Sequence, residues 1–112
     1  MVFIRKMKFS EIGKEGNEIE DEIGLEIDDI LNKLTQELGE FNDAVQKFRG
    51  RYCRTREKNN NNIKEEAGDL FFNLISLCNR LGINPDELPD LAENTLNKFK
   101  ERKKLYISNQ KK

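Results

Sequence analysis

The sequence contains no histidine and no tryptophan. The absence of histidine excludes imidazole acid or base catalysis, the usual Ser-His and Cys-His nucleophile pairs, and most catalytic zinc sites, which rely on imidazole ligands. The absence of tryptophan and histidine also leaves only phenylalanine and tyrosine as aromatic groups for stacking on a ligand. Any catalysis by this chain must therefore use carboxylates, lysine, tyrosine or a metal ion.

The sequence also has no large excess of positive or negative charge. It contains 20 basic and 21 acidic residues, which gives a formal net charge of −1. A balanced charge provides no general attraction for nucleic acid and no polybasic membrane anchor, so we expect neither partner. No apolar run approaches the roughly 18 residues of a membrane span, and the N-terminus lacks the apolar core of a signal peptide. The sequence predicts a cytoplasmic protein whose two cysteines, Cys53 and Cys78, are free thiols.

At 112 residues the chain is long enough for one domain with a modest core, so residues 1–112 are interpreted as a single domain. Residues 1–16 show no clear periodicity and are predicted to be irregular. A stripe of apolar residues then recurs every three or four positions from about residue 18, which indicates an amphipathic helix with a possible break at Gly24 and an end at Gly50. The stripe consists of Ile19, Ile23, Ile27, Leu31, Leu34, Leu38, Phe41, Val45 and Phe48.

Residues 50–62 are polar and include four consecutive asparagines, a composition that favours a loop. A second helix is predicted from about residue 63 to 81, capped by Asn62 and ended by Gly82. Asn84 and Pro85 can begin a third element, whose regular part starts near Leu88, and residues 106–112 are expected to fray. The last helix has an apolar face formed by Leu88, Leu91, Ala92, Leu96 and Phe99. Because no strand pattern appears, the expected fold is all-α, a small antiparallel helical bundle.

Two pairs of acidic residues stand out from the eight that are spaced three residues apart. Glu37 and Glu40 flank the apolar stripe of the first helix, and Glu66 and Asp69 lie at the edge of the apolar stripe of the second. Both occur in the same local pattern of acid, apolar, glycine, acid, apolar, in "ELGEF" and "EAGDL". An isolated acidic pair usually belongs to a solvated helix face, so the position beside the apolar stripe is what makes these two pairs candidates for a site.

The second helix is apolar around most of its circumference, because Phe71, Phe72 and Ile75 lie outside its main stripe. Such a helix is expected to be central in the bundle or to be covered by a second subunit. We therefore predict at least a dimer, with a homodimer and a homotetramer both open.

Four carboxylates at the edge of a core need a cation, because an unpaired buried charge costs several kcal/mol. The sequence supplies no four matching lysines at that place, and carboxylate oxygens without histidine or cysteine suit Mg²⁺, or Mn²⁺ as a substitute. Gly39 and Gly68 then have a use if they let helices or a ligand approach closely. A magnesium ion held by carboxylates commonly completes its shell with substrate phosphates, so a phosphorylated substrate is expected. Basic candidates to meet it are Lys98 and Arg102, with Lys47, Arg49, Arg51 and Lys64 near the loop.

The segments "LTQELGEFNDAV" and "IKEEAGDLFFNLISLCNRLGI" together resemble the MazG-like nucleotide pyrophosphohydrolases, whose signature is E-x-x-E on one helix and E-x-x-D on the next. The resemblance covers about residues 26–103, and the first 25 residues do not match. It implies an all-α oligomer that hydrolyses a nucleoside triphosphate to the monophosphate and pyrophosphate, with Mg²⁺ as cofactor. The removal of noncanonical nucleotides is one role that such an enzyme can serve. The resemblance also implies metal ligands and substrate contacts. The implied ligands are Glu37, Glu40, Glu66 and Asp69, and the implied nucleotide or phosphate contacts are Asn73, Asn94 and Lys98, beside which Arg102 is a further candidate.

Two other functions stay open at this point. The chain can be a helical dimer that binds nucleotides or a protein partner without catalysis, or an enzyme similar to phosphoribosyl-ATP pyrophosphohydrolase. The sequence also leaves open which of Glu37 and Glu40 is the general base and which nucleobase is preferred.

Overall fold

The computed structural model describes residues 6–51 and 60–110, and these residues form helices joined by short turns, with no strand among them. The predicted all-α class is therefore confirmed. In chain order the elements are α1 (Phe9–Glu22), α2 (Ile27–Phe48), α3 (Asn61–Arg80), the 3-10 helix η1 (Pro85–Glu87) and α4 (Leu88–Gln110). No helix in the described ranges is long and apolar enough to span a membrane.

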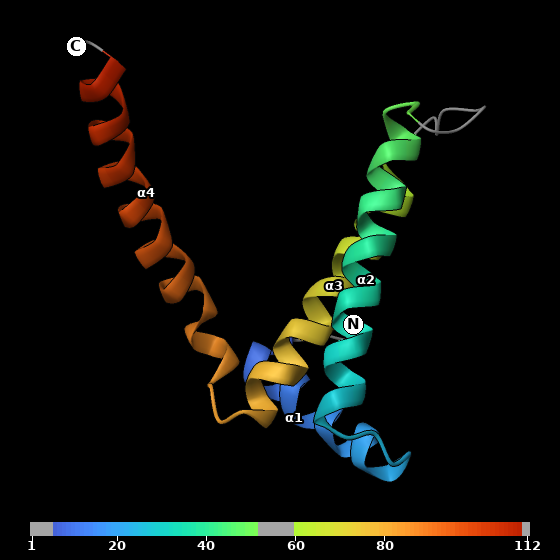
Figure 1. Cartoon of the computed structure of the whole chain (residues 1–112). Coiled ribbons are helices and arrows are strands. Elements are labelled where there is room, and N and C mark those ends of the chain that lie inside the picture. The colour runs from blue at the N-terminus through green and yellow to red at the C-terminus, as the bar shows by residue number, and fades with distance from the viewer. Residues whose placement is uncertain (1–5, 52–59, 111–112) are drawn as a thin grey trace, which may run out of the picture.

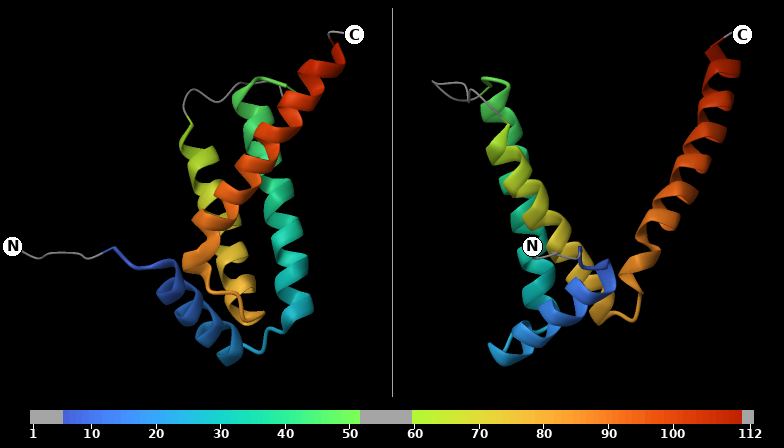
Figure 2. Two further views of the ribbon diagram at one scale, coloured as in Figure 1. Left: turned by 90° about the vertical axis from the view of Figure 1, so that its left-hand side faces the viewer. Right: turned by 180° about the vertical axis from the view of Figure 1, so that it is seen from behind.

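The molecule has the shape of an open V (Figure 1). One arm is an antiparallel pair of long helices, α2 and α3, and α1 crosses α3 at the base. The other arm is α4, which extends away from the rest of the chain, as the two further views confirm (Figure 2). Helix α3 contacts both α1 and α2, whereas α4 contacts only η1. The predicted antiparallel bundle is thus present in α1 to α3, and α4 does not close it within one chain.

The core is small and lies on the two sides of α3. Ile30 and Ala44 of α2 pack on one side, and Ile75, Leu77 and Cys78 are the buried apolar residues of α3 itself. Cys78 is a free thiol, as expected. Cys53 lies outside the described residues, so its state stays a prediction.

The helix ends follow the turn residues of the sequence. Gly24, Gly50 and Gly82 have positive φ angles of 79°, 73° and 80°, a conformation that glycine adopts at little cost. They end α1, α2 and α3, which confirms the predicted break at Gly24 and both predicted helix stops. At η1 the side chain of Asn84 accepts a hydrogen bond from the Asp86 N–H at 2.9 Å, and α4 begins at Leu88 as expected.

The prediction that residues 1–16 are irregular is wrong for residues 9–16, which belong to α1. Gly13 and Gly16 do not interrupt this helix but allow it to approach α3. A Cβ added at Gly13 would lie 2.9 Å from Asn79 Cβ, and one added at Gly16 would lie 3.0 Å from Phe72 Cζ. The two glycines therefore allow close packing of α1 on α3. Because glycine occupies buried positions that apolar side chains usually fill, the sequence of α1 shows no clear apolar periodicity.

A network of polar side chains fixes α1 to α3. Glu20 is only 7% exposed, and it accepts hydrogen bonds from Ser76 Oγ at 2.6 Å and Asn17 Nδ2 at 3.0 Å. Arg80 forms ion pairs with Glu20 at 3.2 Å and Asp21 at 3.0 Å. Asn17 Oδ1 also accepts a hydrogen bond from Asn79 Nδ2 at 2.8 Å. Ser76 and Arg80 contact different carboxylate oxygens of Glu20, so each of the two oxygens has a partner from the chain itself.

Three further expectations need correction. Ile75 is 2% exposed, because the helices of the chain itself bury it, so it is not part of a surface for a second subunit. Residues 106–110 belong to the last turns of α4 and are helical rather than frayed, and α3 begins at Asn61 within the predicted loop 50–62.

Candidate metal centre

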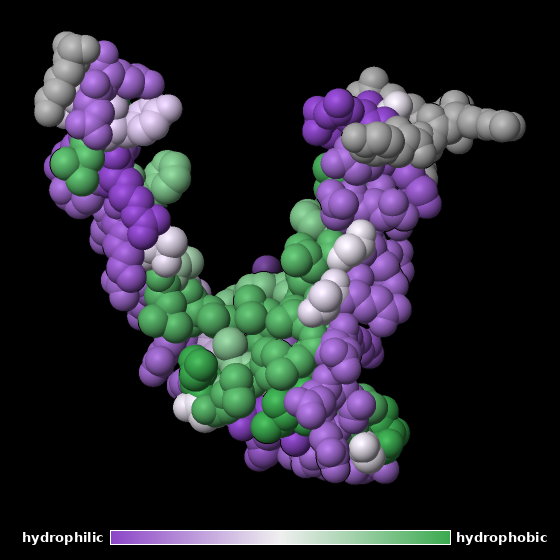
Figure 3. Space-filling view, viewed as in Figure 1, coloured by the Kyte–Doolittle hydropathy of each residue, from purple (hydrophilic) through white to green (hydrophobic). Residues whose placement is uncertain are grey.

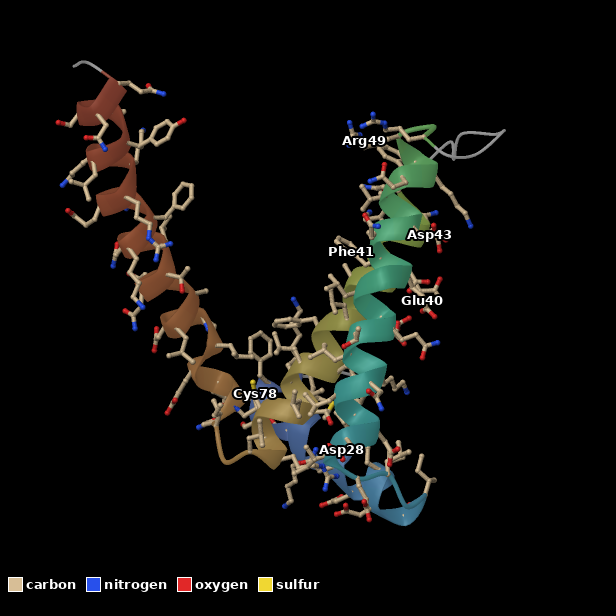
Figure 4. The ribbon with its side chains drawn as sticks, viewed as in Figure 1. Asp28, Glu40, Phe41, Asp43, Arg49 and Cys78 are labelled. Atoms are coloured by element: carbon tan, nitrogen blue, oxygen red, sulfur yellow. The ribbon has the colours of Figure 1, made fainter. Side chains whose placement is uncertain are left out.

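The candidate site lies on α2 and α3 where the two antiparallel helices run side by side. Glu37 and Glu40 come from successive turns of α2 and Glu66 comes from α3. One carboxylate oxygen from each of these three residues lies within 4.8 Å of the other two. Glu40 points to the side of α2 away from α4, whereas its neighbour Phe41 points towards the opening of the V (Figure 4). The structure thus brings together three of the four predicted ligands.

Asp69, the fourth predicted ligand, is exposed and lies outside this set of three oxygens. It is still close enough for its charge to act on Glu37 and Glu66, as their pKa values show below.

In the part of the chain that the structure describes, the carboxylates of this cluster have no cationic partner. Oε2 of Glu37 and Oε2 of Glu66 are buried and accept no hydrogen bond. Among residues 6–51 and 60–110, no lysine or arginine forms an ion pair with Glu37, Glu40, Glu66 or Asp69. Glu40 Oε1 accepts a hydrogen bond of 3.3 Å from the uncharged Gln36 Nε2. These oxygens are therefore available to a ligand from outside the chain.

The carboxylates of the cluster disfavour one another's ionisation. Burial raises the pKa of Glu37, and hydrogen bonding with Glu40 and the negative charges of Glu40, Asp69 and Glu66 raise it further. Burial also raises the pKa of Glu66, followed by the charges of Glu40, Asp69 and Glu65. Several carboxylates that repel one another disfavour their own ionisation, and a bound cation reverses this effect.

The residues present fit a divalent metal ion. Three carboxylates converge, two of their oxygens are buried without a partner, and the cluster includes no cysteine among the described residues, while the sequence has no histidine. Oxygen donors of this kind suit Mg²⁺ or Mn²⁺ rather than zinc.

Asn73 lies one turn beyond Asp69 and is only 2% exposed. Its Nδ2 donates a hydrogen bond to the backbone carbonyl of Asp69 at 2.8 Å. The side chain is therefore occupied within α3 rather than presented on the surface for a nucleotide.

Asn94, Lys98 and Arg102 are exposed residues of α4. Because α4 contacts neither α2 nor α3, the single chain does not bring these three side chains to the carboxylates. Sequence reasoning placed all of them in one site because it assumed a closed bundle.

Gly39 and Gly68 lie next to the acidic pairs, and a Cβ added at either position would meet nothing within 4 Å. The expectation that they allow close approach of the helices is wrong, since open space surrounds both. The alternative that they leave room for a ligand stays a prediction.

Comparison with known proteins identifies the family. The family model of the MazG nucleotide pyrophosphohydrolase domain matches residues 25–106, well over half of the chain. No curated protein and no solved structure matches the chain. The matched segment contains both acidic pairs and both helices of the candidate metal centre. The chain therefore belongs to the MazG nucleotide pyrophosphohydrolase family.

Proposed function

We propose that this chain is a Mg²⁺-dependent nucleoside triphosphate pyrophosphohydrolase that converts a ribo- or deoxyribonucleoside triphosphate and water to the monophosphate and pyrophosphate. The family supports hydrolysis of nucleotide phosphoanhydrides. The observation that carries the proposal is the pair of buried oxygens without partners, Glu37 Oε2 and Glu66 Oε2, in the middle of the family motif.

In this proposal Glu37, Glu40, Glu66 and Asp69 hold the metal. When bound, Mg²⁺ supplies neutralisation of the phosphate charge and a fixed position for the phosphate oxygens. Glu37 or Glu40 takes the proton from the attacking water, because both lie on α2 at the cluster and a carboxylate is the available base in a chain without histidine. Asn73 acts as a positioning residue that holds the backbone at Asp69.

Asn94, Lys98 and Arg102 remain the proposed contacts for the nucleotide and its phosphates. Their cationic and amide groups suit phosphate oxygens. Since α4 extends away from α2 and α3 within one chain, these contacts depend on an assembly in which α4 meets another copy.

The direct test is incubation of the full chain with a panel of ribo- and deoxyribonucleoside triphosphates and Mg²⁺, with pyrophosphate as the readout. We expect pyrophosphate release from at least one substrate and its loss in Glu66→Gln and in Asp69→Asn. Glu18→Gln is the matched control, because Glu18 also belongs to an acidic pair but lies on α1. Turnover that survives both site variants overturns the assignment of the site.

The same panel separates the two alternative functions. Binding of a nucleotide in the presence of Mg²⁺ without any cleavage identifies a non-catalytic binding protein. Cleavage of phosphoribosyl-ATP alone identifies an enzyme of that type.

A further inference from the structure

The four proposed metal ligands differ in how the fold holds their side chains. Glu37 and Glu66 each have one carboxylate oxygen, Oε2, buried beside the neighbouring helix, so packing restricts these two side chains. Glu40 and Asp69 are exposed, and packing does not fix their rotamers. An exposed carboxylate that serves a metal ion therefore needs another group to orient it.

The orientation of a ligand affects metal affinity because binding fixes the side chain. A flexible glutamate loses rotamer freedom when it becomes a ligand, and this loss weakens binding. A neighbouring group that holds the side chain in its bound orientation beforehand reduces the loss. Removal of such a group commonly lowers metal affinity about 10- to 100-fold, although the group never contacts the metal.

Gln36 provides a contact of this kind to Glu40. It lies four residues before Glu40 on α2, and residues with this spacing stand on the same face of a helix. Nε2 of Gln36 donates a hydrogen bond of 3.3 Å to Glu40 Oε1. A carboxylate oxygen of Glu40 also lies within 4.8 Å of carboxylate oxygens of both Glu37 and Glu66. The amide thus holds Glu40 in an orientation that brings it to the other two acids.

An amide is well suited to this position. Its N–H group donates to a carboxylate without adding charge, so it orients Glu40 and leaves the negative charge of the cluster for a cation. A lysine or arginine at the same place would pair with Glu40 and repel the metal ion. Figure 3 shows mainly hydrophilic residues along the outer side of the arm formed by α2 and α3, and hydrophobic residues inside the V. Glu40 points to this hydrophilic side, where water competes for an exposed carboxylate that has no fixed partner (Figure 4).

Asp69, the other exposed acid, has an amide neighbour on α3. Asn73 lies four residues after Asp69, and its Nδ2 donates a hydrogen bond of 2.8 Å to the Asp69 backbone carbonyl. That contact fixes the turn of the helix, whereas the contact of Gln36 reaches a carboxylate oxygen. Gln36 is therefore the better placed of the two amides to set the position of a ligand atom.

We propose that Gln36 is a positioning residue of the metal centre, which holds Glu40 towards Glu37 and Glu66 before a divalent cation binds. Gln36 acts through Glu40 and contacts neither the metal nor the substrate. The proposal rests on the cation site of the proposed function but not on its reaction, so it holds whether or not the chain hydrolyses nucleotides.

The first test measures binding of Mn²⁺ to the full chain, from the electron paramagnetic resonance signal of the free ion. Gln36→Met keeps the length of the side chain and its helix propensity but removes the donor. We expect its dissociation constant for Mn²⁺ to be about 10-fold higher than that of the natural chain. Circular dichroism checks that the helical content is unchanged.

Asn42→Leu is the matched control for this titration. Asn42 is an exposed amide of the same helix that accepts a hydrogen bond of 3.5 Å from Gln46, away from the carboxylates of the cluster. Its replacement should leave the dissociation constant within about twofold. An unchanged affinity in Gln36→Met, an equal loss in both variants, or no Mn²⁺ binding by the natural chain overturns the proposal.

The second test separates orientation of a ligand from loss of a catalytic group. In Gln36→Met, the Mg²⁺ concentration for half-maximal pyrophosphate release should rise about 10-fold, while the rate at saturating Mg²⁺ stays within about twofold. A rate that remains low at saturating Mg²⁺ gives Gln36 a different role and overturns the proposal. If the natural chain binds Mn²⁺ but releases no pyrophosphate, the proposed function fails, and the Mn²⁺ titration still decides the role of Gln36.

Discussion

Glu20 and Glu37 are both glutamates packed between helices, and they differ in what surrounds their oxygens. Glu20 lies between α1 and α3, where Ser76, Asn17 and Arg80 satisfy both oxygens. Glu37 lies between α2 and α3, where its buried Oε2 has no partner among the described residues and carboxylate oxygens of Glu40 and Glu66 lie within 4.8 Å. Both sides of α3 thus accommodate an acid, but in the part of the chain that the structure describes only the acid on the α1 side has both of its oxygens satisfied. A side that the chain leaves incomplete is where an external cation is expected to bind.

The largest expected effect is on catalytic activity, and it distinguishes Glu37, between α2 and α3, from Glu20, between α1 and α3. Glu37→Gln removes a charged ligand from the cluster and should reduce Mg²⁺-dependent pyrophosphate release by at least about 100-fold. Glu20→Gln keeps most hydrogen bonds of the α1 network and should change the rate of the folded enzyme by less than about threefold. Initial rates at saturating Mg²⁺, measured on samples with matched helical content, check this difference. A similar loss in both variants would contradict the assignment.

The next effect distinguishes them by stability. Arg80→Met leaves Glu20 buried without its cation and should lower the free energy of unfolding by about 3 kcal/mol in a urea titration. Lys104→Met breaks an exposed ion pair with Glu101, and its effect should stay within about 0.5 kcal/mol. Equal effects of the two substitutions would show that the α1 network is not what holds α1 to α3.

The pH dependence of stability should come from the carboxylates between α2 and α3. The pKa values of Glu37 and Glu66 are raised above 4.5, so the folded state binds their protons more tightly than the unfolded state does. Their contribution is therefore fully favourable below pH 4.5 and is lost as the pH rises through the raised values. Thermal unfolding of the metal-free chain should show this loss as the pH rises above 4.5.

The double variant Glu37→Gln, Glu66→Gln is the reference for that measurement, because it lacks both titrating groups. Its melting temperature should depend less on pH in this range, and Mg²⁺ at pH 7 should raise the melting temperature of the natural chain only. Identical pH curves for the two proteins would place the titrating groups elsewhere.

The smallest expected effect compares glycines of the two sides. Gly68→Ala fills open space in the interior of α3 and should raise the free energy of unfolding by about 1 kcal/mol. Gly16→Ala brings a methyl group to 3.0 Å from Phe72 Cζ and should lower it by about 1 kcal/mol. Urea titrations of both variants give the sign of each change, and a stabilising Gly16→Ala would contradict the close packing of α1.

The sequence was sufficient for α2, α3 and the metal cluster because their signals are local. Apolar spacing defined the helices, Gly50 and Gly82 ended them, and acids at the edge of the stripes marked the site. Helix α1 could not be predicted from periodicity, since Gly13, Gly16 and Glu20 form its buried face and none of them is a typical core residue. The i, i+3 pair of Asn17 and Glu20 beside two glycines was the one available signal of a packed polar face.

The position of α4 was beyond sequence reasoning for a different reason. Leu88, Leu91 and Phe99 show correctly that one face of α4 is apolar, but periodicity does not say which chain that face packs against. The expected site therefore joined Lys98 to Glu37 across a gap that one chain does not close.

The burial of Pro85 beside Gly13 links the direction of α4 to a helix outside the family match, which begins at residue 25. A shortened chain starting at that residue would retain the acidic motif but lose the support under η1, so the angle between the two arms would no longer be fixed. Sequence segments that surround a shared domain can in this way determine how its helices are placed relative to one another while leaving its chemical groups untouched.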